Sequence, residues 1–294
     1  MARGGRNARS GPPGTASRDV QVSKKLSWLL RHGAEKEGLK LDRGGYISVT
    51  DVLNNRTIKP LKVTMPELAE IILTNEKQRF GLIPTSYDPA SGEPVPSTTD
   101  TANTISSTSD PADFLIRANQ GHTLTVDAEA LLTRIAADTP DLPRTVVHGT
   151  NRRAWKLIAG SGGLKTMGRN HVHFATGLPA GFASIEDGGN QEELGVSVVP
   201  EPVISGMRKT STVLVYVDLA KAMETGLEFW RSDNGVILCD GGEQDLIPIE
   251  CFKCVEERGE GGGVLVRDGT IIKELAGLDR QTTEGGKGKG RRKG

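Results

Sequence analysis

The chain has 294 residues with 37 basic and 37 acidic side chains, so its formal net charge is zero. That balance excludes a uniformly basic nucleic-acid coat, and no stretch reaches the roughly 18 to 20 apolar residues that a membrane span needs. The length fits one large domain or two smaller ones. A hydrophobic fraction of 36%, beside 37 glycines and 15 prolines, indicates that part of the chain packs into no core.

The zero charge is a sum of unequal segments. Residues 1–19 and 20–83 carry +3 and +4, residues 84–113 and 114–283 carry −5 and −6, and residues 284–294 carry +4. Residues 84–113 contain little apolar surface to offset the entropy cost of ordering them, so we expect a disordered acidic insertion or a long surface loop. We expect the basic termini, residues 1–19 and 281–294, to be disordered for the same reason.

The composition also bears on the compartment. The N-terminus has no apolar stretch of the kind that a secretory signal contains. Three cysteines cannot all pair, which favours a reducing compartment. Cys251 and Cys254 form a CxxC pair, a pattern typical of zinc or redox sites, but the only other cysteine is Cys239, and buried structural thiols fit better. We therefore expect an intracellular protein, in the cytoplasm or the nucleus.

Residues 20–83 are expected to form a first lobe. Apolar residues from Val22 to Leu30 recur at helical spacing, with Ser23 as a candidate N-cap and Gly38 as the stop. Residues 39–49 alternate around two glycines and predict a hairpin. Thr64 begins a capping box with a proline in the first turn, so another helix follows it. Two or three helices and a hairpin resemble a winged-helix module.

Residues 114–280 are expected to form a second, strand-rich lobe. Short apolar or β-branched runs at 114–116, 145–147 and 213–217 predict strands, and residues 154–160 predict a helix. Asp218 is a candidate cap for a helix that follows the third of these strands. Two further strands between Phe229 and Leu238 are predicted to form a hairpin, because Asn234 and Gly235 are a strong turn signal.

All five histidines stand in polar motifs near arginine or glycine. An arginine fork beside a histidine suits a phosphate monoester, although for Arg31 and His32 alone a solvated pair remains the alternative. His171 and His173 alternate along a predicted strand and share a face, but no acidic residue or cysteine lies nearby to complete a metal site. The whole pattern predicts a metal-free site for several anionic groups. Its members are His32, His122, His148, His171 and His173, accompanied by Arg31, Arg117 and Arg169.

Six motifs, in this order, resemble the NAD-dependent tRNA 2′-phosphotransferase family: SKKLSWLLRHGA, GLKLDRGGYISVTDVL, IRANQGHT, HGT, GLKTMGRNHVHFA and GMRKTSTVLVYVDLAKAMETGLEFWRSDNGVIL. The resemblance covers about residues 22–82 and 114–255. It implies an α+β protein with an N-terminal winged-helix lobe and a C-terminal lobe that has the ADP-ribosyltransferase fold. It also implies NAD as co-substrate and tRNA with a splice-junction 2′-phosphate as partner. We expect a monomer that contacts no membrane and needs no metal.

The resemblance implies roles for single residues. Those expected to hold the RNA 2′-phosphate and adjoining phosphates are Arg31, His32, Arg117 and His122. Those expected to bind NAD are His148, Gly149, Thr150, Arg169, His171, Ser232 and Asn234. The residues expected to be catalytic are Arg31, His32, Arg117 and Arg169. Thr123 stands where many family members have Ser, while the acidic insertion and the glycine-rich run at 259–263 lie outside the motifs.

In the implied reaction, a 2′-phosphate oxygen attacks C1″ of NAD and nicotinamide leaves. The ribose 2″-hydroxyl then attacks phosphorus, which yields 2′-hydroxyl RNA and ADP-ribose 1″,2″-cyclic phosphate. The phosphate monoester is largely dianionic at neutral pH, so the first step needs no general base. This fits motifs that offer no catalytic carboxylate and supply arginines instead.

Two other functions remain possible from the sequence. One is a transferase that ADP-ribosylates a terminal nucleic-acid phosphate or a protein, since the first chemical step is shared. The other is a non-enzymatic winged-helix RNA-binding protein with a degenerate second lobe. The complete set of arginines and histidines argues against the second alternative.

Overall fold

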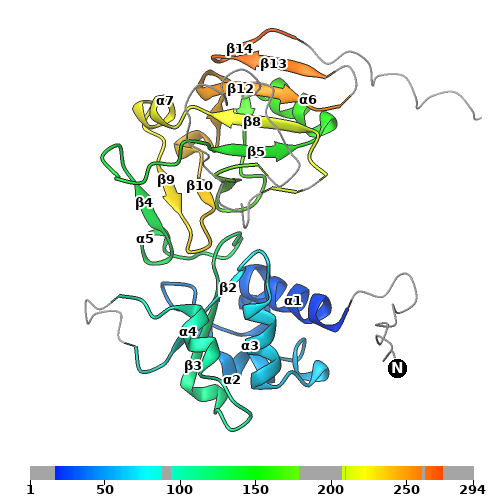
Figure 1. Ribbon diagram of the computed structural model, residues 1–294, viewed down its shortest axis with the longest axis vertical. Helices are drawn as coiled ribbons and strands as arrows, with labels where there is room; N and C mark the ends of the chain where they lie inside the picture. The colour runs from blue at the N-terminus through cyan, green and yellow to red at the C-terminus, as the bar shows by residue number, and fades with distance from the viewer. Residues whose placement is uncertain (1–16, 88–93, 179–206, 209, 260–261, 274–294) are drawn as a thin grey trace, which may run out of the picture.

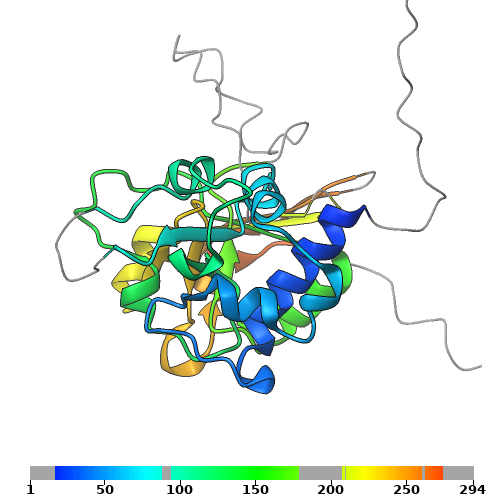
Figure 2. The same cartoon turned by 90° about the horizontal axis from the view of Figure 1, so that it is seen from below.

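The computed structural model describes residues 17–87, 94–178, 207–208, 210–259 and 262–273, which form two lobes (Figure 1). The molecule is mixed α and β with several antiparallel sheets, as an α+β protein should be. Figure 2 looks up at the first lobe, whose helices lie in front of the second. The termini for which we expected disorder lie almost entirely outside the described residues.

The first lobe packs helices against a three-stranded antiparallel sheet in the order β1-β3-β2. Its hydrophobic core includes Leu26, Leu68 and Ile116, all without solvent exposure. The predicted capping box is confirmed, because the Thr64 side chain accepts a hydrogen bond from the Glu67 amide. The helical elements are α1 (Arg18–Trp28), the π-helix η1 (Leu29–Gly33), η2 (Glu35–Glu37), α2 (Val49–Asn54), η3 (Lys59–Leu61), α3 (Met65–Leu73), α4 (Thr98–Asn103) and η5 (Pro111–Asp113). The strands are β1 (Ile47–Ser48), β2 (Phe80–Pro84) and β3 (Phe114–Ala118).

Two local predictions in the first lobe are wrong. Helix α1 begins at Arg18 with Ser17 as its N-cap, and Ser23 lies inside the helix. The extra turn is held by an ion pair of 2.5 Å between Arg18 and Glu67 of α3, a contact that local sequence does not reveal. Residues 39–49 contain a tight turn but no hairpin, because the strand that follows the turn pairs with β3 instead.

The acidic segment is partly ordered, against our expectation for residues 84–113. Residues 98–103 form α4, which Ser97 caps by accepting a hydrogen bond from the Asp100 amide. The Thr98 hydroxyl also accepts a hydrogen bond of 3.0 Å from the Leu82 amide of β2. Ala102 is 2% exposed and packs into the core of the first lobe. A polar sequence is therefore ordered here by a few contacts with β2 and α3 that its composition does not show.

The second lobe is built from antiparallel sheets. A five-stranded sheet has the order β14-β13-β12-β8-β5, a four-stranded sheet has the order β4-β9-β10-β7, and β11 pairs with β6. One bridge between Val147 and Ala175 connects the two larger sheets. The strands are β4 (Thr133–Ile135), β5 (Val147–Thr150), β6 (Gly163–Leu164), β7 (Val172–Phe174), β8 (Val213–Val217), β9 (Phe229–Arg231), β10 (Ile237–Cys239), β11 (Ile247–Pro248), β12 (Phe252–Glu257), β13 (Gly263–Arg267) and β14 (Thr270–Ile271). The helices are α5 (Ala128–Leu131), α6 (Arg152–Gly160), α7 (Leu219–Glu224), η7 (Gly242–Gln244) and η8 (Ile249–Cys251).

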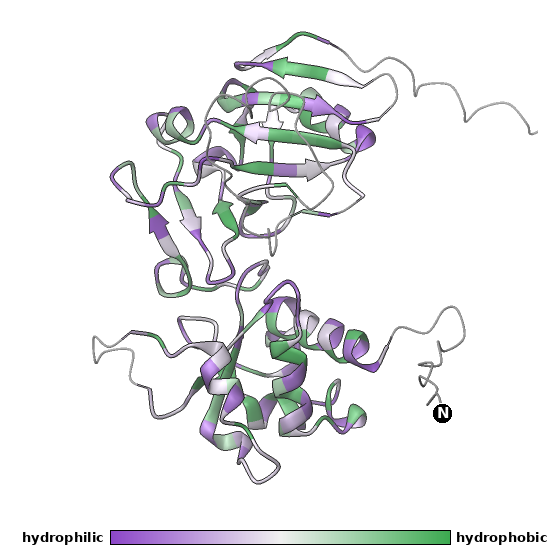
Figure 3. Ribbon diagram, viewed as in Figure 1, coloured by the Kyte–Doolittle hydropathy of each residue, from purple (hydrophilic) through white to green (hydrophobic). Residues whose placement is uncertain are grey.

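The core of the second lobe lies between its sheets and helices. Figure 3 shows hydrophobic residues along β8 and β13, and both strands contribute to the buried cluster. The predicted hairpin is confirmed, since β9 pairs with β10, and Asp218 caps α7 as predicted. The three cysteines are buried, and burial raises the pKa of Cys239 to about 12, which fits structural thiols.

Candidate active site

Backbone hydrogen bonds bring together three motifs that lie far apart in the sequence. The carbonyl of Arg31, in η1, accepts hydrogen bonds from the amides of Thr123 (3.0 Å) and Leu124 (3.4 Å). The carbonyl of His122 accepts one from the amide of Asn170, at 3.0 Å. The segment after β3 is thus hydrogen-bonded to η1 on one side and, on the other, to Asn170, which precedes β7. The LRH, QGHT and RNHVH motifs therefore meet where the two lobes join.

Arg31 carries a buried positive charge. Its Nε and Nη2 atoms are buried and have no hydrogen-bond partner in the described part of the chain. Burial, together with the nearby charges of Arg79 and Arg169, lowers the pKa of Arg31 to about 10. The guanidinium still holds its proton at neutral pH. Because an uncompensated buried charge is costly, this arrangement suits an anionic ligand that would supply the missing partner.

Arg117, on β3, is fixed from several sides. It is 4% exposed and donates to the carboxylate of Asp233 at 2.6 Å and to the carbonyl of Gly44 at 3.1 Å. Its guanidinium lies over the ring of Tyr46, 4.5 Å from the centroid. The remaining Nε atom is buried without a hydrogen-bond partner among the described residues. Gly81 pairs with Arg117 across β2 and β3, and a β-carbon there would lie 3.3 Å from that Nε, so the glycine leaves room for the arginine side chain.

His122 and His173 are neutral at physiological pH. Burial, with the charge of nearby arginines, lowers the pKa of each to about 3. The Nε2 atoms of both rings are buried and lack a hydrogen-bond partner within the described residues. Gly121, at φ +88°, lies between them and Arg31: its β-carbon would be 3.6 Å from Arg31 Cζ and 3.6 Å from His173 Nε2. Arg31 and His173 therefore converge on one point of the backbone.

His32 lies at the rim of this cluster. Its Nδ1 is 3.0 Å from the hydroxyl of Thr123, so the residue that departs from the family pattern makes the same contact that a serine could make. Burial and then the charge of Arg31 lower the pKa of His32 below its usual value. The ring is therefore mostly neutral at pH 7.

The second lobe holds a cavity of about 780 Å³, a size that small-molecule sites commonly have. His148 on β5 uses Nδ1 to contact the carbonyl of His173 at 3.0 Å. A carbonyl only accepts, so Nδ1 carries the proton and, in the neutral ring, Nε2 is an acceptor. Gly149 is required by close packing, because a β-carbon there would lie 2.3 Å from Met207 Cγ. The predicted NAD-binding residues that line the cavity are His148, Gly149, Thr150, Arg169 and His171.

Ser232 and Asn234 do not line this cavity. Both are buried in the turn between β9 and β10, where the Ser232 hydroxyl is 2.7 Å from Asn234 Oδ1. Asn234 Nδ2 donates across the lobes to the carbonyl of Lys77 at 2.9 Å. These contacts, with the ion pair between Asp233 and Arg117, make the turn a brace between the lobes. Their expected contact with NAD stays a prediction.

Sequence reasoning missed four residues of the cluster: Tyr46, Arg79, Asn119 and Asp233. Asn119 is 5% exposed, and its Oδ1 has no hydrogen-bond partner in the described residues, while its Nδ2 donates to the carbonyl of Gln78. Its position inside the IRANQGHT motif was a usable signal. Tyr46 and Asp233 also lie inside quoted motifs, whereas Arg79 lies outside them and only its tertiary contacts reveal it.

Two further findings concern the described part of the chain. No group of three or more His, Cys, Asp or Glu side chains is arranged there to hold a metal ion. None of its helices combines the length and the apolar character that crossing a membrane requires.

Comparison with known proteins identifies relatives over most of the chain. Tested against family profiles, residues 17–241 match the RNA 2′-phosphotransferase, Tpt1/KptA family. The tRNA 2′-phosphotransferase 1 of Danio rerio is 35% identical over 231 residues, which are 79% of this chain and 82% of the relative. The human tRNA 2′-phosphotransferase 1 is 34% identical over 253 residues, 86% of this chain and 81% of the relative. The tRNA 2′-phosphotransferase of Saccharomyces cerevisiae is 30% identical over 246 residues, 82% of this chain and 85% of the relative. Together with the convergence of the motifs at the junction of the lobes, these matches show that the chain belongs to the RNA 2′-phosphotransferase, Tpt1/KptA family.

Proposed function

We propose that this protein is an NAD-dependent tRNA 2′-phosphotransferase that removes the splice-junction 2′-phosphate of ligated tRNA. One observation carries the proposal: within the described residues, buried guanidinium nitrogens of Arg31 and Arg117 have no hydrogen-bond partner and lie near neutral histidines. A phosphate monoester has several acceptor oxygens and a double negative charge, which such a set neutralises. The names of the relatives support the same substrate.

We infer that the first lobe is a winged-helix module and that the second has the ADP-ribosyltransferase fold. Helices α1, α2 and α3 against a three-stranded sheet support the first assignment. The five- and four-stranded antiparallel sheets, joined by the bridge between β5 and β7, support the second. We extend the first lobe beyond the boundaries expected at residues 83 and 113, because β3 (Phe114–Ala118) pairs with β1 and β2, and α4 packs onto the same lobe.

NAD fits the second lobe as co-substrate. It would supply an electrophilic ribose carbon with nicotinamide as the leaving group. His148, whose Nε2 is an acceptor, lines the cavity, and Gly149 and Thr150 follow it along the cavity wall. Arg169 lines the same cavity, and its charge also lowers the pKa of Arg31. We therefore assign Arg169 to the phosphate or the pyrophosphate during transfer.

The chain's own residues would act by position and charge. Arg117 is locked by Asp233, Gly44 and Tyr46, so it can hold a phosphate without reorganising. Arg31 and Arg169 would stabilise the charge that spreads over phosphate oxygens in the second step, an effect typically worth about 3 to 4 kcal/mol for one donor. His32, neutral at pH 7 and in contact with Thr123, is placed to hydrogen-bond the phosphate or the departing oxygen.

The decisive experiment incubates the protein with a 2′-phosphorylated oligonucleotide, with and without NAD. We expect loss of the phosphate and formation of ADP-ribose 1″,2″-cyclic phosphate only when NAD is present. Oligonucleotides with a 5′- or 3′-terminal phosphate serve as controls for the alternative transferase activity. A stable ADP-ribose adduct on the terminal phosphates, with the 2′-phosphate untouched, would replace this proposal with that alternative.

We further propose that the protein works as a monomer inside the cell. Side chains of one chain suffice to build the cluster, from η1, β3 and β7. The buried thiols, including Cys239 with its raised pKa, suit a reducing compartment, either cytoplasm or nucleus. Gel filtration and a light-scattering mass would test the monomer.

A further inference from the structure

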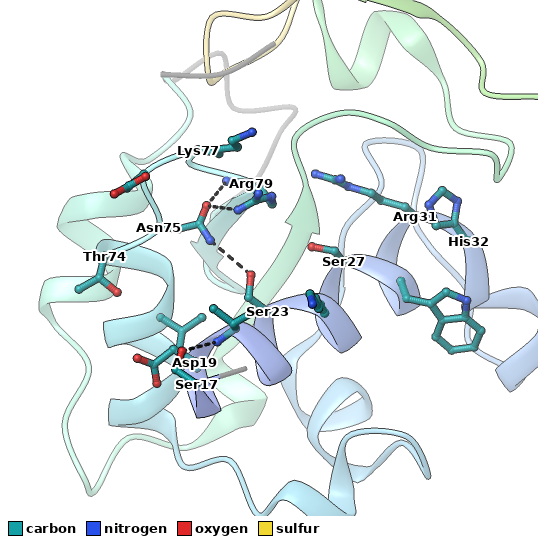
Figure 4. Close-up of a pocket in the computed structure, with 15 residues that line it drawn as sticks. Ser17, Asp19, Ser23, Ser27, Arg31, His32, Thr74, Asn75, Lys77 and Arg79 are labelled. Carbon is teal, nitrogen blue, oxygen red and sulfur yellow. Dashed lines mark hydrogen bonds between the residues drawn. The ribbon is translucent and has the colours of Figure 1, made fainter. Parts of the chain in front are cut away.

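A second cavity, of about 720 Å³, lies on the first lobe and ends at Arg31 and His32 (Figure 4). One wall is a single face of α1 and η1, because Asp19, Ser23 and Ser27 of α1 and Arg31 of η1 recur at intervals of four residues. The opposite wall is the turn at 74–79, which leads from α3 into β2. Figure 4 shows Arg31 extending above Ser27 toward the side of the groove where Arg79 and Asn75 lie. The proposed phosphate site therefore continues into a groove on the surface.

The groove is basic where it approaches Arg31. Lys24, Lys77 and Arg79 line it together with Arg31 and His32, whereas its acidic residues are Asp19 and Glu76. Arg79 is held by Asn75, whose Oδ1 accepts from Arg79 Nη1 at 3.0 Å. Asn75 Nδ2 is in turn 3.3 Å from the hydroxyl of Ser23 on α1. The two walls are thus joined by hydrogen bonds, which fixes one of the cations in place.

Trp28 adds an aromatic surface to this groove. Trp28 is the last residue of α1 and is 41% exposed, whereas a tryptophan is usually well buried. The ring packs against Gly33 of η1, since a β-carbon on Gly33 would lie 2.6 Å from Trp28 Cζ3. A glycine and a π-helical turn therefore hold the indole in one orientation. An exposed and rigid indole beside cations is the combination that binds unpaired nucleotides.

We propose that this groove, lined by Lys24, Ser27, Trp28, Lys77 and Arg79, binds a nucleotide adjoining the phosphorylated one in single-stranded RNA. The neighbouring base stacks on Trp28, and its backbone phosphate contacts the basic side chains. A paired and stacked base has no free face to offer, so the groove selects RNA that is unpaired next to the modified nucleotide. The inference rests on the proposed function in that it places the 2′-phosphate at Arg31.

The catalytic test compares a nucleoside 2′-monophosphate with two 2′-phosphorylated dinucleotides, one extended on the 5′ side and one on the 3′ side. In the wild-type protein, one of the two neighbours should raise kcat/KM. Stacking of one base on an aromatic ring is worth roughly 1 to 3 kcal/mol. Trp28→Ala should therefore lower kcat/KM for the favoured dinucleotide by about 5- to 150-fold. Trp28→Ala should leave turnover of the mononucleotide unchanged, and Trp28→Phe should restore most of the gain.

Charge is tested separately. Lys24→Glu should lower kcat/KM for the favoured dinucleotide and leave kcat/KM for the mononucleotide unchanged. Lys253→Glu, the same charge change at an exposed site on β12, should alter neither value. Equal losses on mononucleotide and dinucleotide in Trp28→Ala and Trp28→Phe would overturn the inference, because Trp28 would then only support η1. Absence of any gain from either neighbour would overturn it as well.

A binding measurement separates this inference from the proposed function. Trp155 and Trp230 are 3% and 6% exposed, so a fluorescence change on adding RNA reports mainly on Trp28. An unphosphorylated single-stranded oligonucleotide should quench the wild-type signal, and Trp28→Phe should lose that quenching. Quenching without any NAD-dependent phosphate release would sink the proposed function but support the groove. Equal quenching by duplex RNA, or none by either RNA, would refute the groove whether or not phosphate is released.

Discussion

Lowering the pH from 7.5 to 5.0 should destabilise this protein through two buried histidines. Burial, together with nearby arginines, lowers the pKa of His122 and His173 to about 3, while the unfolded chain keeps values near 6.5. Below pH 6.5 the unfolded state therefore binds protons that the folded state does not. The free energy of unfolding falls as the pH falls through that range.

The size of the effect follows from these pKa values. At pH 5.0, a histidine with a folded pKa of about 3 and an unfolded pKa near 6.5 contributes a loss of roughly 2 kcal/mol relative to pH 7.5. His122 is 3% exposed, so little solvent screening reduces this value. His173 has the same folded pKa of about 3, so it should contribute a loss of similar size.

The assay is urea unfolding at both pH values in buffers without phosphate or sulfate, since those anions would bind the site. His122→Gln should lose about 2 kcal/mol less between pH 7.5 and 5.0 than the wild type does. His32→Gln is the matched control, because His32 is less buried and should change the pH dependence less. The carboxylates paired with arginine, such as Asp127 with its lowered pKa, titrate below this window. An identical pH dependence in the wild type and His122→Gln would refute the reasoning.

Three further predictions concern the site and the fold. Arg117→Ala should reduce 2′-phosphate removal by at least about 100-fold with an unchanged circular dichroism spectrum, because its partner Asp233 is 49% exposed and stays solvated; wild-type turnover would contradict the assignment. Arg169→Ala should slow the second step more than the first, so ADP-ribosylated RNA should accumulate in quenched reactions, and finding none would count against its role. Ala102→Asp should lower the melting temperature far more than Thr99→Asp, because Ala102 is 2% exposed; equal melting temperatures would show that α4 is not packed as described.

The sequence by itself determined the features that depend on near neighbours. The caps at Thr64 and Asp218 and the turn at Asn234 and Gly235 form as predicted, because each involves hydrogen bonds within a few residues. The motifs also identified the family and most residues of the cluster. The residue types in these motifs were enough, because arginines beside histidines predict a site for an anionic group.

The tertiary structure decided which residues meet and what state they are in. The contact between Arg31, Gly121 and His173 joins segments more than 50 residues apart, and no local pattern encodes it. The placement of Ser232 and Asn234 in a brace, and of Ala102 in a core, likewise depends on distant partners. The low pKa values of His122 and His173 depend on burial, which exists only once the two lobes have closed around the rings. Local hydrogen bonds and composition can be predicted from the chain, whereas burial and long-range packing are properties of the folded molecule.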